Sequence, residues 1–154
     1  MNDIDFMRAA LLQAKHAFEK GEVPVGAVIA YNGVSIAEAH NEVEASREAS
    51  AHAELLAMRR AAGVLGNWRL TDCVLYTTLE PCIMCSGAAI LSRVKKIVYS
   101  ARDLRHGGDG SITSLFDIEH PIHRVEIEGG LCAEESATLM QTFFKERRHA
   151  TRSH

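Results

Sequence analysis

The segment CVLYTTLEPCIMCSGAAILSRVKKIVYS (residues 73–100) sets the architecture that we expect. It begins with an apolar run typical of a buried strand, continues through Pro81 into a helical stretch, and ends in a second strand, KKIVYS. Proline is favoured in the first turn of a helix, so we expect the helix to begin there. Strands that alternate with helices predict a sheet that is parallel in at least one part.

The flanking sequence predicts further elements of the same sheet. Ser50 is an expected helix N-cap, Gly63 an expected helix stop, and Asn32-Gly33 a strong hairpin turn. The fold class is therefore α/β, a three-layer α/β/α arrangement in which a central mixed five-stranded sheet carries helices on both faces. The expected flanking elements are helices over 3–20, 50–62 and 133–148, a hairpin over 25–41 and a strand over 123–129.

The composition predicts one domain with a buried core, since 47% of the 154 residues are hydrophobic and 24% are charged. We expect this domain to span 1–154, with its last helix ending near residue 148 before a short basic tail.

A formal net charge of −3 excludes a basic field over the whole surface. Asp3, Asp5 and Arg8 exclude a signal peptide, and no stretch reads as a membrane span. We expect a reducing, cytoplasmic compartment.

Two predicted helix starts carry the residues with metal chemistry. Cys82 and Cys85 are three apart, so both sulfurs can reach one point, and a helix N-terminus favours their thiolate form. His52, near the start of the helix over 50–62, can supply a third zinc ligand. Three protein ligands leave a fourth position for water, and Glu54 can accept the proton of that water. The pattern predicts a catalytic zinc site.

Other interpretations of these cysteines remain open. A Cys-x-x-Cys pair that opens a helix after a strand is also typical of a thioredoxin-type redox site. A closed structural zinc site that recruits Cys73 or Cys132 is a further alternative. The order His-x-Glu, about thirty residues, then Pro-Cys-x-x-Cys is more restrictive than either motif alone and favours a zinc hydrolase.

This order resembles the signature of the zinc-dependent cytidine and nucleobase deaminases. Within that superfamily the chain is most similar to the bacterial tRNA-specific adenosine deaminases, and the similarity spans nearly its whole length. The matching stretches are EVPVGAV at 22–28, AHAE at 51–54, NWRL at 67–70, TLEPCIMCSGA at 78–88, SRVKKIVYSARD at 92–103 and FFKERR at 143–148.

The resemblance implies a cytidine-deaminase-like fold and hydrolysis of the wobble adenosine of a tRNA anticodon to inosine. It also implies one zinc ion per subunit and a homodimer that binds the anticodon stem-loop. The implied roles are zinc ligation by His52, Cys82 and Cys85, proton transfer by Glu54, and contact with the nucleoside or RNA by Asn41, Ala53, Asp103, Phe144 and Arg148.

Several of these residues also have structural interpretations. Asn41 and Asp103 are ordinary turn and loop residues, and helical spacing favours core or dimer packing for at least one of Phe143 and Phe144. The basic residues near the C-terminus suit a solvated helix end. As an RNA-binding patch, the basic side chains would be Arg102, Arg105, Lys145, Arg147 and Arg148.

One departure from the family pattern concerns the approach to the metal-bearing helix. Relatives usually have Pro-Thr before AHAE, whereas this chain has Ala49 and Ser50. Loss of the proline relaxes the chain that enters the helix, although Ser50 keeps a capping hydroxyl. The alternative functions are a deaminase of a free base such as guanine or cytosine, and a zinc-stabilised RNA-binding module without catalysis.

Overall fold

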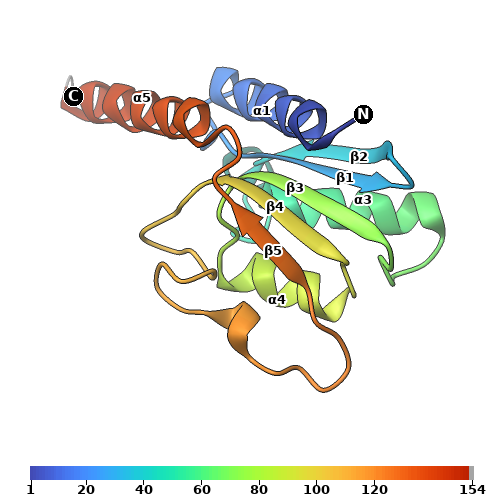
Figure 1. Ribbon diagram of the computed structural model, residues 1–154. Coiled ribbons are helices and arrows are strands. Elements are labelled where there is room, and N and C mark those ends of the chain that lie inside the picture. Colours follow the sequence, from blue (N-terminus) through green and yellow to red (C-terminus); the bar gives the residue numbers. More distant parts are fainter. Residues whose placement is uncertain (153–154) are drawn as a thin grey trace.

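The computed structural model describes residues 1–152, with side chains described through residue 150. It contains a five-stranded sheet of order β2-β1-β3-β4-β5 (Figure 1). β1 pairs antiparallel with β2 and β3, whereas β3, β4 and β5 run parallel, which confirms the mixed sheet predicted from the sequence. The strands are β1 (Gly26–Tyr31), β2 (Val34–His40), β3 (Cys73–Leu79), β4 (Lys96–Ala101) and β5 (Glu126–Gly129).

Helices cover both faces of the sheet, as expected for three layers (Figure 1). Alternating residues of β1 face opposite sides: Ile29 joins the core beneath α3 and α4, while Val28 joins the cluster beneath α1. In the described part of the chain, no helix combines the length and apolarity needed to cross a membrane. The helices are α1 (Asp3–Glu19), α2 (Val43–Ser46), α3 (Ala53–Leu65), α4 (Ile83–Leu91), the short 3-10 helix η1 (Leu115–Asp117) and α5 (Ala133–Arg152).

The hairpin prediction is confirmed, and its turn residues explain why. Asn32 and Gly33 both have positive φ, 51° and 75°, which is the conformation that a tight two-residue hairpin requires. At the other end of β1, Gly26 packs directly on α1. A Cβ at this position would overlap the backbone of Ala10 and Ala14, so glycine here permits close approach of helix and sheet.

The ends of two predicted helices were wrong. α3 begins at Ala53 with His52 as its N-cap, because the Ser50 carbonyl accepts from the His52 N–H in a turn outside the helix. It ends at Leu65, where Gly66 adopts the left-handed conformation, so Gly63 lies inside the helix. α4 begins at Ile83 with Cys82 as N-cap, which places Pro81 just before the helix.

The final helix and the connections also differ from the sequence-based expectation. α5 continues to Arg152, so residues 149–152 extend the helix instead of forming a tail, and residues 153–154 lie outside the described residues. Only the second half of 123–129 forms a strand. The segment 42–49, between the hairpin and the helix predicted over 50–62, contains the one-turn helix α2.

Candidate active site

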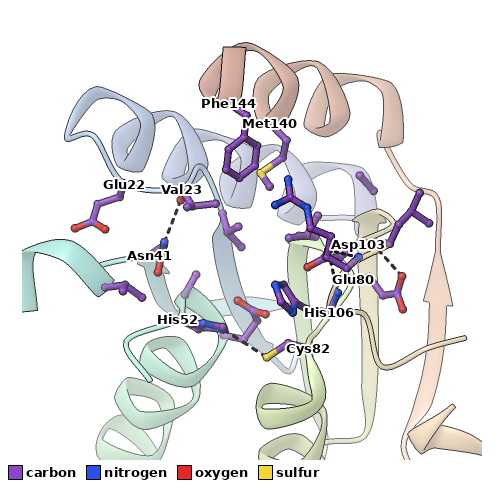
Figure 2. A pocket seen from close by; sticks show the side chains of 18 of the residues that line it. Glu22, Val23, Asn41, His52, Glu80, Cys82, Asp103, His106, Met140 and Phe144 are labelled. Carbon is purple, nitrogen blue, oxygen red and sulfur yellow. Dashed lines mark hydrogen bonds between the residues drawn. The ribbon is translucent and has the colours of Figure 1, made fainter. Parts of the chain in front are cut away.

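The N-termini of α3 and α4 meet at one edge of the sheet and bring the predicted metal ligands together (Figure 2). The His52 Nδ1 lies 3.5 Å from the Cys82 Sγ and 3.5 Å from the Cys85 Sγ. All three ligand atoms lie within 4.8 Å of one another. A tetrahedral zinc ion with bonds of about 2.3 Å to sulfur and about 2.0 Å to nitrogen separates such atoms by about 3.5 Å. The donor set and its spacing therefore fit zinc.

The charges of the two thiols support a cation-binding role. A hydrogen bond from the Cys85 thiol, with help from His52, lowers the pKa of Cys82 to about 4. The same bond and burial raise the pKa of Cys85. The hydrogen bond with Cys82 raises the pKa of His52, against the effect of burial. A cation bound among the three ligand atoms would take the place of their protons and neutralise the sulfurs.

The alternatives of a closed zinc site and a redox pair receive no structural support of their own. Within the described residues, neither Cys73 nor Cys132 belongs to the group of possible ligands. Cys73 is buried at the start of β3, away from the N-termini of α3 and α4. The imidazole beside both sulfurs makes the pair part of a three-ligand cluster, which a simple dithiol would not need.

Glu54 is the buried carboxyl group beside this cluster. It lies in the first turn of α3, two residues after His52, and is only 4% exposed. Burial raises its pKa to about 7, and the His52 charge opposes the shift. A carboxyl group that gains and loses its proton near neutral pH is suited to general acid and base catalysis.

His52, Glu54 and Cys82 lie on the wall of a cavity of about 700 Å³. Cys85 lies in the ligand cluster but is not a lining residue of the cavity. Figure 2 shows Met140 and Phe144 of α5 facing the edge that carries His52 and Cys82. The residues predicted from the sequence that line the cavity are Asn41, His52, Ala53, Glu54, Cys82, Asp103, Phe144 and Arg148.

Asn41 presents an unsatisfied acceptor at this wall. The residue is 6% exposed, and its Nδ2 donates to the Val23 carbonyl at 3.4 Å (Figure 2). Its Oδ1 is buried without a hydrogen-bond partner among the residues that the structure describes. Because buried acceptors are almost always paired, this atom can accept a hydrogen bond from a group that enters the cavity.

The two phenylalanines of α5 have different environments. Phe143 is buried and packs edge-on against Phe18 with ring centroids 5.9 Å apart, which confirms core packing for one member of the pair. Phe144 lines the cavity, and the Arg105 guanidinium lies 5.0 Å from its ring centroid. The predicted basic patch is thus divided, since Arg102, Arg105 and Arg148 line the cavity whereas Lys145 and Arg147 do not.

The sequence interpretation missed two buried carboxylates on the cavity wall, Glu22 and Glu80. Glu22 accepts the backbone N–H groups of Glu44 at 2.9 Å and Ala45 at 2.7 Å, so it anchors the start of α2. Glu80 follows the apolar strand β3 directly and precedes Pro81. A charged residue at the end of a buried strand, next to a metal motif, was the signal that could have found it.

Comparison with known proteins gives consistent results. The family model of the MafB19-like deaminases matches residues 1–148. The tRNA-specific adenosine deaminase of Bacillus subtilis is 46% identical over 93% of this chain and 89% of its own length. That of Aquifex aeolicus is 48% identical over 94% of this chain and 95% of its own. A solved structure from work on A-to-I editing by tRNA:A34 deaminases has a TM-score of 0.81 at 36% identity, covering 88% of this chain and 98% of that one.

Proposed function

The chain belongs to the family of tRNA-specific adenosine deaminases, and from this we propose that it hydrolyses the wobble adenosine of a tRNA anticodon to inosine. The observation that carries the proposal is the buried Glu54 carboxyl group beside the atoms of His52, Cys82 and Cys85 that can hold one metal ion. Hydrolytic removal of an amino group requires an activated water and a group that transfers protons, and this arrangement can provide both.

The metal is proposed to be zinc, held by His52, Cys82 and Cys85. When bound, zinc would supply the Lewis acidity that makes water reactive near neutral pH. Glu54 accepts one proton from the attacking water and passes it to the ring nitrogen. It then takes the proton of the newly formed hydroxyl group and passes it to the amino group, which leaves as ammonia. Its low exposure excludes bulk water, which would compete for those protons.

The cavity wall provides groups that orient a purine nucleoside. Among the residues that the structure describes, the Asn41 Oδ1 has no donor and can accept from a ligand. Ala53 is the first residue of α3, whose first-turn N–H groups have no acceptor within the helix. A cavity of about 700 Å³ is in the range that encloses a whole ligand. Phe144 and Arg148 line it farther along α5, which suits bases and phosphates on either side of the target adenosine.

The family also supports three wider proposals about the assembly. We propose a homodimer with one zinc ion per subunit, a cytoplasmic location, and one deaminase domain over 1–154. Large apolar side chains at the N-terminal and C-terminal turns of α4 are exposed, which is consistent with burial in a subunit contact; they are Ile83, Met84 and Leu91.

The decisive experiment incubates purified protein with tRNA and sequences the anticodon after reverse transcription. Wild type should form inosine at the wobble position, whereas Glu54→Ala should retain fold and metal content and form none. Glu119→Ala, which changes an exposed carboxylate, should behave like wild type and is the matched control. Inosine formation by Glu54→Ala would remove this residue from the mechanism.

The same preparations distinguish the alternative functions. Guanine and cytosine supplied as free bases, with ammonia release as the readout, test for a free-base deaminase. Ammonia release without change in tRNA would replace the proposed function by that alternative. If neither substrate changes while Glu54→Gln still binds tRNA as tightly as wild type, the protein is an RNA-binding module.

A further inference from the structure

The connection between β4 and η1 forms one side of the cavity mouth, although most of it has no regular secondary structure. Five successive residues at its start, 102–106, line the cavity and include Asp103 and Arg105. The connection continues past Gly107 to Ser111, and the residues 102–111 are called the mouth loop below. Irregular backbone keeps one shape only where other groups hold it, so the contacts of the mouth loop decide the geometry of the site.

The Glu80 side chain makes several of the contacts that hold this loop. Its Oε1 accepts from the Asp103 N–H at 3.1 Å and from the Ser111 hydroxyl at 2.5 Å, and its Oε2 accepts from the Asp109 N–H at 2.8 Å. The Arg102 Nη1 lies 3.7 Å from the Oε1 and also donates to the Asp109 carbonyl at 2.9 Å. One carboxylate therefore contacts the beginning, the middle and the end of the mouth loop.

Burial makes these contacts strong. Glu80 is only 1% exposed, and a buried carboxylate must be paired and hydrogen-bonded to offset the loss of hydration. Among the described residues, the hydrogen-bond and ion-pair partners of its carboxylate all come from the mouth loop, as Figure 2 shows for Asp103. If the loop moved away, the buried charge of Glu80 would be left unpaired. The arrangement in which the loop contacts this carboxylate is therefore favoured over one in which it does not.

Gly107 shows that the mouth loop is shaped around this carboxylate. A Cβ at Gly107 would overlap the carboxyl group of Glu80. Its φ is not positive, so glycine is required here for space and not for conformation. Gly107 forms an isolated bridge with Cys82, and the Gly108 N–H donates to the Pro81 carbonyl at 2.8 Å. The loop thus lies directly against the segment that begins the metal-bearing helix.

We propose that Glu80 is a positioning residue that fixes the mouth loop against the Pro81-Cys82 segment and so sets the affinity for the RNA substrate. The inference deepens the proposed function and rests on it. Glu80 itself does not touch the reacting atoms. It holds Asp103 and Arg105 where a flipped nucleotide and its neighbours enter, so that the site is ordered before the RNA arrives.

The informative variant is Glu80→Gln, which keeps the shape of the side chain. In the wild-type protein one oxygen of Glu80 accepts from the Asp103 N–H and the other accepts from the Asp109 N–H. The amide of glutamine replaces one of these acceptor oxygens by an NH2 donor. Either orientation of the glutamine turns one of these N–H groups toward another donor. We expect at least one end of the mouth loop to be released.

Three measurements test this on the purified, metal-loaded protein. Amide hydrogen exchange at Asp103 and Asp109 should become faster in Glu80→Gln, while exchange in β3 and β4 stays as in wild type. KM for tRNA should rise roughly tenfold, as expected for loss of a charged hydrogen bond, with kcat within about threefold. Zinc content should not change. Glu22→Gln alters a second buried carboxylate of the wall that accepts from backbone N–H groups, and it should leave exchange at Asp103 and Asp109 unchanged.

Gly107→Ala tests the same contact from the loop side and needs no change at Glu80. Alone, it should displace the carboxylate and raise KM as Glu80→Gln does. In a Glu80→Ala background the added methyl group has space, so its further effect on KM should be less than twofold. Ser111→Ala removes one contact without stranding a buried N–H, so it should fold and give a smaller rise in KM.

The inference is overturned if exchange at both amides is unchanged in Glu80→Gln, if the loss falls on kcat with KM constant, or if zinc is lost. If Glu80→Gln does not fold, the other variants decide. The inference is then overturned if the effects of Gly107→Ala and Glu80→Ala on KM are additive, or if KM is unchanged in Ser111→Ala. If wild type forms no inosine, the proposed function fails, and with it the assignment of Glu80 to RNA affinity. The exchange data then still decide whether Glu80 holds the loop.

Discussion

Replacement of Asn41 by alanine should separate substrate binding from stability. Most buried polar side chains stabilise the fold through their partners, so their loss is costly. Asn41 is different, because its Oδ1 has no partner in the described part of the chain. The one side-chain hydrogen bond that it makes there, from Nδ2 to the Val23 carbonyl, is long at 3.4 Å. The substitution removes an oxygen that loses its hydrogen bonds to water when the chain folds and gains no hydrogen bond among the described residues.

The expected magnitudes follow from that geometry. An unpaired buried acceptor costs about 1–3 kcal/mol, and its removal should offset the packing and the weak hydrogen bond that alanine loses. The free energy of unfolding should therefore stay within about 1 kcal/mol of wild type. A hydrogen bond from Oδ1 to the substrate is lost at the same time, so kcat/KM for tRNA should fall by about 10- to 100-fold.

Urea unfolding measures the first quantity and initial rates of inosine formation measure the second. Thr77→Val is the matched control, because the Thr77 hydroxyl is fully buried and donates to the Leu79 carbonyl at 3.1 Å. That variant should lose about 1 kcal/mol of stability and keep its activity. A loss of more than about 2 kcal/mol in Asn41→Ala, or unchanged kcat/KM, would refute the assignment of Oδ1 to substrate binding.

Three further predictions concern the metal, the aromatic pair and two glycines. Chelation should lower the melting temperature by about 5–10 °C relative to protein with zinc at 100 times its dissociation constant, and scanning fluorimetry that shows no shift would contradict a metal site. Phe143→Ala should cost about 3–5 kcal/mol in chemical unfolding because its ring is buried, whereas Phe144→Ala should chiefly raise KM for tRNA; equal stability losses would contradict this division. Gly63→Ala, in open space within α3, should stabilise by about 0.5–1 kcal/mol, while Gly26→Ala should destabilise by at least about 2 kcal/mol through overlap with α1; the reverse order in urea unfolding would contradict the packing.

Local patterns made the elements and the metal cluster predictable. Apolar periodicity is a property of neighbouring residues, so the strand-helix-strand segment 73–100 and the hairpin at Asn32-Gly33 were found without knowledge of the fold. The ligands were found because two cysteines three apart can reach one ion in any context. Helix ends were less accurate, since both Ser50 and His52 can precede a helix and only the turn over 48–52 selects between them.

Contacts between segments far apart in sequence were decided by the tertiary structure alone. The sequence by itself determined which residues form helices and strands, and which side chains have metal and proton chemistry, because both depend on local spacing. It did not contain, in any local pattern, the strand order, the choice of Phe143 for the core, the unpaired Oδ1 of Asn41, or the contact of Glu80 with residues 102–111. Each of these depends on which groups come into contact once the sheet has assembled. Burial then increases the free energy of each polar contact and the cost of each polar group without a partner.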